Sequence, residues 1–298
     1  MFYSLGLSLL DGSRWSVALR KSGIFFFFLC LYLPWITVVL LSFAKAKEKG
    51  EVSSDLWKLW ESFTTENYPK LFSLSQGDND SFWKSLCNSF AIAISAIVPS
   101  MWISLMSAFA IWKRGGKMKS IIFKISNLSI SSPELIQGLS FFLLFSAVFL
   151  PMKLNFGFGT IILAHIAFLV PYGIILIYPK LEKINKRVLL ASYDLNCAEL
   201  ETLYKIVVPQ LKGTLVFTSL VMLILSMDDF IITSLVRGRI NTLTTQLYTM
   251  KKGVKAWALT FGSLLFMFSA LIFIAYSFAT SPRVATKLKL KNQLLQLL

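Results

Sequence analysis

The sequence has few charges, few acidic residues and one histidine, and each shortage excludes a class of protein. Only 15% of its 298 residues are charged, whereas a soluble domain carries about 25%, so a water-soluble enzyme is not expected. The single histidine, His165, leaves little basis for histidine-dependent catalysis. The three cysteines, Cys30, Cys87 and Cys197, lie far apart in no metal-ligand spacing, which argues against a disulfide framework or a zinc site.

A nucleotide-binding loop is missing as well. The nearest candidate, Gly115-Gly116-Lys117, is followed by Met118 rather than serine or threonine, and the earlier glycine of the motif is absent. The chain is therefore not expected to be an enzyme, and any ATP that drives it would be hydrolysed by another subunit. Neither a cofactor nor a metal is predicted.

Apolar and basic residues, by contrast, are abundant. Hydrophobic residues make up 55% of the chain, and 30 lysines and arginines outnumber 15 aspartates and glutamates; the mean hydropathy is +0.66. A membrane accounts for both features, because apolar helices cross it and basic loops remain on its cytoplasmic side. Membrane lipid, and not nucleic acid, is therefore the expected surrounding partner.

Six apolar runs are long enough to cross a bilayer, since about twenty helical residues span its roughly 30 Å hydrocarbon core. The runs are 22–43, 86–112, 121–150, 154–179, 213–236 and 256–280. Charged residues interrupt two of them, Lys124 and Glu134 in the third and Asp228 and Asp229 in the fifth. The sequence predicts an all-α polytopic membrane protein with six transmembrane helices and a transmembrane region over 22–280.

The basic residues also predict an orientation. Three of them stand just before the first run, which favours a cytoplasmic N-terminus, and an even number of spans returns the C-terminus to that side. With this orientation, 18 of the 30 basic residues lie in segments expected on the cytoplasmic side. These segments include 1–21, the loop 180–212 and the basic tail 281–298. The basic outer loop 237–255 is an exception, explained equally well by docking to an acidic partner or by solvation.

Carboxylates inside apolar spans are the first candidate functional residues. An aspartate at the centre of a spanning helix costs about 2.5–3.5 kcal/mol on insertion scales, so it usually faces a cavity, a partner or a substrate path. We assign Glu134, Ser226, Asp228 and Asp229 to a candidate cation path. The alternatives are that Ser226 or Asp228 caps a half-helix after a break in the span, and that Glu134 starts a helix near the inner interface.

The loop 180–212 is the second candidate. Its apolar residues recur at helical spacing with charged residues between them, which predicts two short amphipathic helices joined near Asn196 and ending at Pro209. These apolar positions are Val188, Leu189, Leu195, Leu203, Ile206 and Val207. Such a loop either lies on the membrane or inserts into a groove of a cytoplasmic partner, and the pattern alone leaves both open.

The loop also resembles a known motif. Leu190 to Asn196, followed by Lys205 to Pro209, is similar to the cytoplasmic loop of binding-protein-dependent ABC importer permeases, which reads Glu-Ala-Ala, three residues, Gly, then Ile-x-x-Pro. Leu190 replaces the glutamate, Ser192 the second alanine and Asn196 the glycine. The resemblance implies a positive φ at Asn196, which asparagine tolerates next best after glycine. Because Leu190 replaces the glutamate, it also implies that coupling to the ATPase depends more on apolar packing.

The resemblance assigns a set of residues to an ATPase-coupling loop. They are Leu190, Ala191, Asp194, Asn196, Ile206 and Pro209.

Downstream, the run Leu225 to Phe230, which reads Leu-Ser-Met-Asp-Asp-Phe, is similar to the spermidine/putrescine permeases of the PotC type. His165 and Tyr248-x-Met250 fall in the matching order, and the resemblance covers about residues 25–280. His165 is otherwise interpreted as a packed polar residue inside the membrane. The resemblance implies a type I ABC importer permease fold in the bacterial cytoplasmic (inner) membrane.

The same resemblance implies a function and partners. The chain would move polyamines into the cytoplasm as one of two different permease subunits, driven by two cytoplasmic ABC ATPase subunits and supplied by an extracytoplasmic polyamine-binding protein. Polyamines are flexible multivalent cations, so a path for them needs spaced carboxylates.

Two other functions remain open. The same architecture could carry another cation such as ferric iron, whereas the paired aspartates disfavour an anion. A secondary transporter could use the acids for ion coupling, but it would be expected to show inverted repeats, and it would leave the loop 180–212 unexplained.

Overall fold

The computed structural model describes residues 14–47, 50–52, 62–73, 78–250 and 253–280. Within these ranges the regular structure is helical, apart from two isolated β-bridges. The chain forms two compact units, residues 1–79 with 252–298 and residues 80–251. Much of the expected N-terminal segment and the whole basic tail, 281–298, lie outside the described residues.

Five helices of the described chain are long and apolar enough to cross a membrane, and one bent helix pair makes a sixth candidate. The five are Lys21–Ser42, Ser81–Arg114, Phe158–Glu182, Glu199–Asp228 and Ala256–Ala275. The prediction of an all-α protein with about six spans is confirmed. Two of the predicted spans nevertheless have a different shape.

The third predicted span, 121–150, is not one straight helix. Helix α5 (Gly116–Ser131) and helix α6 (Glu134–Phe149) are bent by 104° where they meet. Proline forces the residue before it out of the helical region, and Ser132, which precedes Pro133, has φ −75° and ψ 139°. The bend is therefore a local consequence of the proline.

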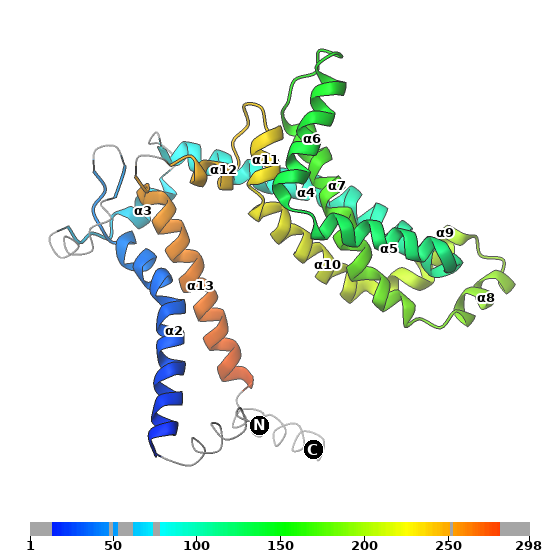
Figure 1. Ribbon diagram of the computed structural model, residues 1–298, viewed down its shortest axis with the longest axis horizontal. Coiled ribbons are helices and arrows are strands. Elements are labelled where there is room, and N and C mark those ends of the chain that lie inside the picture. The colour runs from blue at the N-terminus through cyan, green and yellow to red at the C-terminus, as the bar shows by residue number, and fades with distance from the viewer. Residues whose placement is uncertain (1–13, 48–49, 53–61, 74–77, 251–252, 281–298) are drawn as a thin grey trace, which may run out of the picture. The chain divides into compact units, whose positions relative to one another are not determined.

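The first unit is built from α2 (Arg14–Ser42), α3 (Asn67–Phe72) and α13 (Ala256–Thr280), shown in Figure 1. Helix α2 packs along α13, and the ring of Trp35 stacks on that of Phe266 with centroids 5.5 Å apart. Helix α3 also packs on α13. Two spanning helices are thus held together by apolar side chains.

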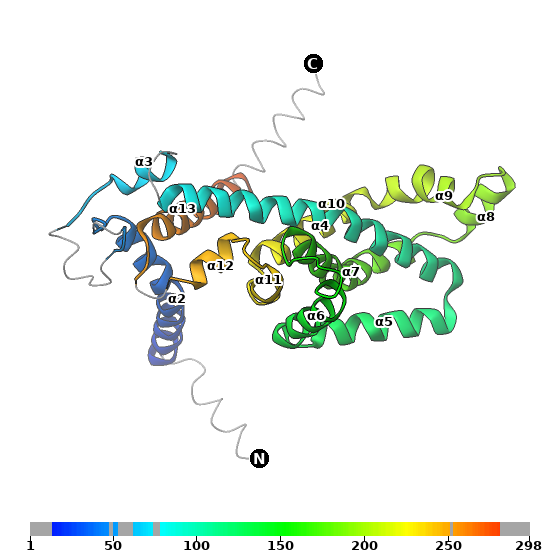
Figure 2. The ribbon, with the colours of Figure 1, turned by 90° about the horizontal axis from the view of Figure 1, so that it is seen from above.

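The second unit contains the remaining long helices, α4 (Asp78–Arg114), α7 (Phe158–Glu182) and α10 (Val208–Asp228), with the short α11 (Ile231–Val236) and α12 (Leu243–Tyr248). Helix α7 packs against α5, α6, α10 and α11 (Figure 2). One apolar cluster joins the last turns of α4 and α7 and includes Leu105, Phe109, Ile177, Leu181, Leu203 and Leu211. A second cluster lies towards their beginnings and includes Ile92, Phe168, Leu169, Met222, Ile232 and Val236.

Gly173 marks a close approach of α7 to α4 and α10. A β-carbon there would lie 2.3 Å from Ser104 Oγ and 2.4 Å from Met222 Cε, and small residues permit such packing between membrane helices. We expect Gly173→Val to destabilise the folded protein by about 1–3 kcal/mol through overpacking. Thermal stability in detergent, followed by size-exclusion chromatography, measures this. Gly159→Ala, in open space on the same helix, is the control, and equal stability of both variants would contradict the prediction.

The predicted amphipathic loop forms α8 (Arg187–Asp194), α9 (Glu199–Glu201) and a π-helix, η2 (Thr202–Val207), which continues directly into α10. The expectation that the second short helix ends at Pro209 is wrong, because Pro209 lies in the first turn of α10. Since η2 runs into α10 without a break, Pro209 lies inside a continuous helical run. The widened π-helical turns directly precede it and give its ring room.

Candidate functional site

The fifth predicted span is broken in the structure, as one of the alternatives supposed, but the break follows Asp228 instead of lying at Ser226 to Asp228. Helix α10 ends at Asp228, and Asp229 follows in an extended conformation with φ −62° and ψ 123°. The Asp229 carboxylate accepts the backbone N–H of Ile232 at 3.2 Å and of Thr233 at 2.8 Å, two donors that a helix start leaves unpaired. Asp229 therefore caps α11. The alternative in which Ser226 or Asp228 does so is wrong.

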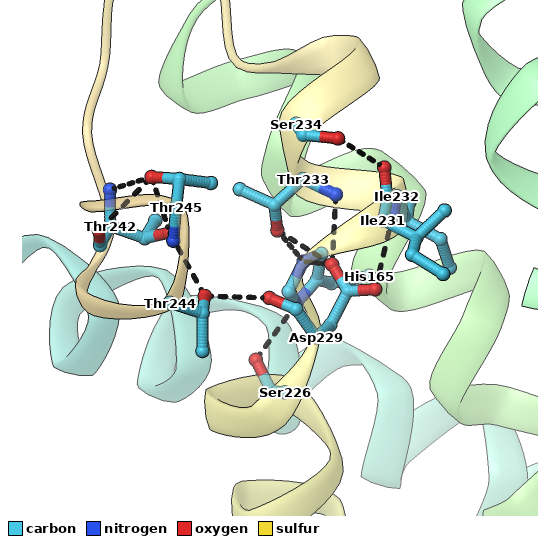
Figure 3. Close-up of polar contacts among 10 residues, drawn as sticks. All are labelled: His165, Ser226, Asp229, Ile231, Ile232, Thr233, Ser234, Thr242, Thr244 and Thr245. Atoms are coloured by element: carbon cyan, nitrogen blue, oxygen red, sulfur yellow. Dashed lines mark hydrogen bonds and ion pairs between the residues drawn. The ribbon is translucent and has the colours of Figure 1, made fainter. Parts of the chain in front are cut away.

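A histidine from α7 completes the surroundings of Asp229 (Figure 3). His165 Nε2 lies 3.5 Å from Asp229 Oδ2, and both side chains are 2% exposed. The two ring nitrogens of His165 lie 2.8 Å from Ser226 Oγ and 3.0 Å from Thr233 Oγ1. The Thr233 hydroxyl donates to Asp229 at 2.7 Å. This buried polar group satisfies its own hydrogen bonds, as a low-dielectric interior requires.

Two further contacts fix the helix break. Thr244, in the first turn of α12, donates its hydroxyl to the Asp229 carbonyl at 2.8 Å. On the other side, α6 packs closely on α11, since a β-carbon at Gly138 would lie 3.2 Å from Ile232 Cα. The break therefore lies where α6, α7, α10, α11 and α12 meet.

Two of the predicted acids are exposed beside this buried group. Glu134, the first residue of α6, and Asp228 are both exposed, and the charges of Asp228 and Asp229 act on Glu134. The structure thus brings together all four residues of the candidate cation path, with Ser226 and Asp229 buried and Glu134 and Asp228 open. Three carboxylates near one another make this region of the unit negative.

The sequence interpretation missed the residues that surround these acids. Thr233 gives no signal in a sequence, because a threonine in an apolar run is ordinary, and Thr244 is one of several threonines in a polar stretch. His165 was interpreted only as packed. Phe230 stacks on Tyr248 with ring centroids 3.9 Å apart and an interplanar angle of 11°. Of these, only His165 and Tyr248 were singled out, by their place in the family pattern.

Acidic and histidine side chains do not form a metal centre in the described chain. Over the ranges that the structure covers, no group of three or more histidines, cysteines, aspartates or glutamates is placed to hold a metal ion.

The coupling-loop residues are placed mostly on the outside of α8. Leu190, Ala191 and Asp194 are exposed, whereas Leu189 and Ser192 face inward and are buried. Leu189 belongs to the apolar cluster at the ends of α4 and α7. The predicted amphipathic pattern is therefore present, and α8 attaches to the unit by one face only.

The serine that departs from the family pattern has a partner within the loop. Ser192 is 1% exposed and accepts a hydrogen bond of 3.0 Å from the hydroxyl of Thr202, the first residue of η2. Glu199, the first residue of α9, forms an ion pair with Lys113 from the last turn of α4. These contacts fix α8 and α9 to the second unit.

Asn196 has the conformation expected of it. Its φ is +57°, in the left-handed region where glycine or asparagine is usual. Its N–H donates to Tyr193 at 2.8 Å and that of Cys197 donates to Ser192 at 3.0 Å, the two bonds of a Schellman motif. The turn thus ends α8 and redirects the chain into α9. Ile206 is half-buried in η2, and Pro209 is exposed at the start of α10.

Comparison with known proteins gives consistent matches. The family described as "Binding-protein-dependent transport system inner membrane component" matches residues 100–281. A Mycoplasma genitalium protein named spermidine/putrescine transport system permease protein PotC homolog is 39% identical over 254 residues, 85% of this chain and 88% of that protein. The Escherichia coli K12 protein named spermidine/putrescine transport system permease protein PotC is 26% identical over 247 residues, 82% and 87% of the two chains.

A solved structure supports the fold. A chain of a bacterial ABC transporter involved in the import of the acidic polysaccharide alginate superposes with a TM-score of 0.61. It covers 91% of this chain and 98% of its own length at 15% identity. At that identity the likeness concerns the fold alone, which is that of an ABC importer permease.

Proposed function

Because the chain belongs to the family of binding-protein-dependent transport system inner membrane components, we propose that it is a PotC-type permease subunit of an ABC importer for spermidine and putrescine. It is a multi-pass protein of the inner membrane. The observation that carries the substrate class is a group of three carboxylates inside the membrane-spanning region: Glu134 at the start of α6, near enough to Asp228 and Asp229 at the end of α10 for their charges to act on it. Such acids are costly there unless they serve a path or a partner.

The exposed acids would meet the substrate first. Glu134 and Asp228 are open, so each offers a carboxylate to one ammonium group of a polyamine. Asp229 is already engaged with Thr233 and His165, so an ammonium reaches it only by displacing those contacts. The Phe230–Tyr248 pair offers aromatic faces worth about 0.5–2 kcal/mol for a cation. Weak, successive sites suit transport, because tight binding slows release.

Neutralising the exposed acids tests this function. We expect Glu134→Gln and Asp228→Asn each to lower spermidine uptake by about tenfold or more, and the double variant by about 100-fold or more, since one charged contact is worth about 1.5–3 kcal/mol and about 1.4 kcal/mol is a factor of ten in rate. Radiolabelled spermidine uptake into vesicles holding the whole importer measures this, with competition by putrescine and by ferric iron. Glu66→Gln, at an exposed acid just before α3, is the control. Uptake that ferric iron blocks and putrescine does not would favour the other cation.

The importer needs partner subunits. Family membership implies a partner permease, ATPase subunits and a binding protein. We infer further that the partner permease is a different chain, that two cytoplasmic subunits hydrolyse the ATP, and that this chain does not. Three exposed leucines support an apolar docking surface around α8 and α9, namely Leu190, Leu195 and Leu200, which are 62%, 77% and 57% exposed. An amphipathic helix of this kind fits a groove on a partner.

The coupling residues then have distinct roles. Leu190, Ala191 and Asp194 lie on the free side of α8 and would contact the ATPase, and Leu190 would do so by apolar packing in place of the family's glutamate. Asn196 sets the turn. Ile206 and Pro209 lie where the segment joins α10, so movement of α8 would reach the acids at the other end of that helix.

An orientation follows from this assignment. With α8 and α9 in the cytoplasm, both termini lie inside, residues 22–280 form the transmembrane domain and 180–212 is the coupling loop. Residues 1–21 and 281–298 are then cytoplasmic segments. The starts of α4 and α7 face outward.

A further inference from the structure

A polar pocket of about 500 Å³ lies in the second unit, where α4 and α7 begin. Two of its lining residues are basic, and none is acidic. Its polar and charged lining consists of Ser81, Lys84, Ser85, Asn88, Arg239 and Asn241. A pocket with two positive charges repels a polyamine, so it does not belong to the cation path.

The loop between α11 and α12, residues 237–242, closes the pocket and is held in one conformation. Asn88 donates its side-chain amide to the Asn241 carbonyl at 2.9 Å, and Arg237 donates to the Ile240 carbonyl at 3.0 Å. Gly238 has φ +59°, and a β-carbon there would lie 2.3 Å from the Phe156 carbonyl oxygen. The loop is therefore preformed, and it presents Arg239 without ordering a mobile segment on binding.

The two basic side chains of the pocket, Lys84 and Arg239, have no partner among the residues that the structure describes. Both are exposed, and neither forms an ion pair or a hydrogen bond within those ranges. Elsewhere in the same unit, the half-buried Lys113 and Lys119 pair with glutamates. Two unpaired cations around a preformed polar hollow favour a carboxylate ligand, which accepts hydrogen bonds from both.

The pocket faces away from the coupling segment. Lys84 lies in the first turns of α4 and Lys113, the partner of Glu199, in its last turn. The helix has 37 residues, about 55 Å at 1.5 Å per residue, which exceeds the thickness of the hydrocarbon core. Figure 2 shows α8 and α9 at the far end of the unit from α12. If α8 meets the ATPase, the pocket opens outside the cell membrane.

From these observations we infer that the pocket receives an acidic side chain of the extracytoplasmic binding protein when that protein docks on the permease. This inference rests on the proposed function, because it takes the outer face and the binding protein from it. It also gives a reason for one basic residue of the loop 237–255, Arg239, which the distribution of charges alone does not explain. A lipid phosphate is the weaker occupant, since only Phe158 and Ile240 of the eight lining residues are apolar.

The test measures docking separately from transport. The whole importer is reconstituted in phosphatidylcholine nanodiscs, and its affinity for its purified binding protein, without polyamine, is measured by surface plasmon resonance at low and high salt. We expect Lys84→Gln and Arg239→Gln each to weaken binding severalfold, and the double variant at least about tenfold at low salt, with less difference at high salt, because screening weakens exposed charge pairs. Lys153→Gln, exposed on the short loop before α7 and outside the pocket, is the matched control.

The outcomes separate the pocket from the substrate. Equal affinities of the double variant, the Lys153→Gln control and the unsubstituted importer would overturn the pocket, as would a defect that arises only when phosphatidylglycerol is added to the nanodiscs. The same samples then receive spermidine-loaded binding protein, and ATP hydrolysis is measured. Weakened docking in the double variant with no stimulation of the unsubstituted importer by spermidine would support the pocket and refute the polyamine assignment.

Discussion

Spermidine uptake by an importer that carries Asp229→Asn is expected to fall by about 10- to 100-fold while the complex still assembles. The asparagine side chain retains an oxygen that can accept the N–H of Ile232 or Thr233, so the start of α11 is kept. The variant loses one negative charge, that of the carboxylate 3.5 Å from His165. The same charge would attract an ammonium group that has passed Glu134. Hydrogen bonds to charged groups are worth about 1.5–3 kcal/mol, which corresponds to that range of rates.

A second substitution separates a role in the path from a role in folding. Asp229→Ala removes the cap as well as the charge, and it is expected to lower the amount of assembled importer because buried donors of α11 lose their acceptor. Uptake in proteoliposomes is divided by the amount of ATPase that co-purifies with the permease. If Asp229→Asn transports at the unsubstituted rate per complex, and Asp229→Ala fails only in proportion to its abundance, then Asp229 acts as a helix cap alone.

The membrane-spanning runs are predictable because the bilayer dictates their length and composition. The bend between α5 and α6 was also within reach, since Pro133 restricts the residue before it wherever it occurs. Which of Asp228 and Asp229 caps the following helix was not predictable from the sequence. The two side chains are chemically identical, and the point where α10 ends, to within one residue, decides which of them faces inward. The partnership of His165 with Ser226 and Thr233 joins positions far apart in the chain, so no local pattern reveals it.

In the coupling loop, 180–212, one feature was likewise predictable from the sequence and another was not. The left-handed turn at Asn196 was predictable, because it depends on a single residue's backbone and on a known motif. The continuation of helix through Pro209 was missed, since a proline in the interior usually ends or kinks a helix. The helix continues here because π-helical turns from Thr202 to Val207 precede the proline, and those turns have no signal of their own in the sequence.

Replacing Asn196 with valine is expected to uncouple ATP hydrolysis from transport. A β-branched residue at φ +57° is a genuine outlier, and left-handed backbone costs about 1–2 kcal/mol for an ordinary residue. The strain is relieved by opening the two hydrogen bonds that Asn196 and Cys197 donate, which frees α8 to change its angle to η2. We expect polyamine moved per ATP hydrolysed to fall about tenfold, while hydrolysis without binding protein continues.

The glycine variant decides whether the turn is the cause. Asn196→Gly removes the same side chain but favours the same backbone conformation, so it should keep the transport-to-hydrolysis ratio of the unsubstituted importer. A loss of coupling in both variants would assign the effect to the amide of Asn196 and its contact with the ATPase. A loss in neither would show that the direction of α8 is set by its buried face, through Leu189 and the Ser192–Thr202 hydrogen bond. Only failure of valine together with success of glycine is explained by a turn that transmits the movement of the ATPase to α10.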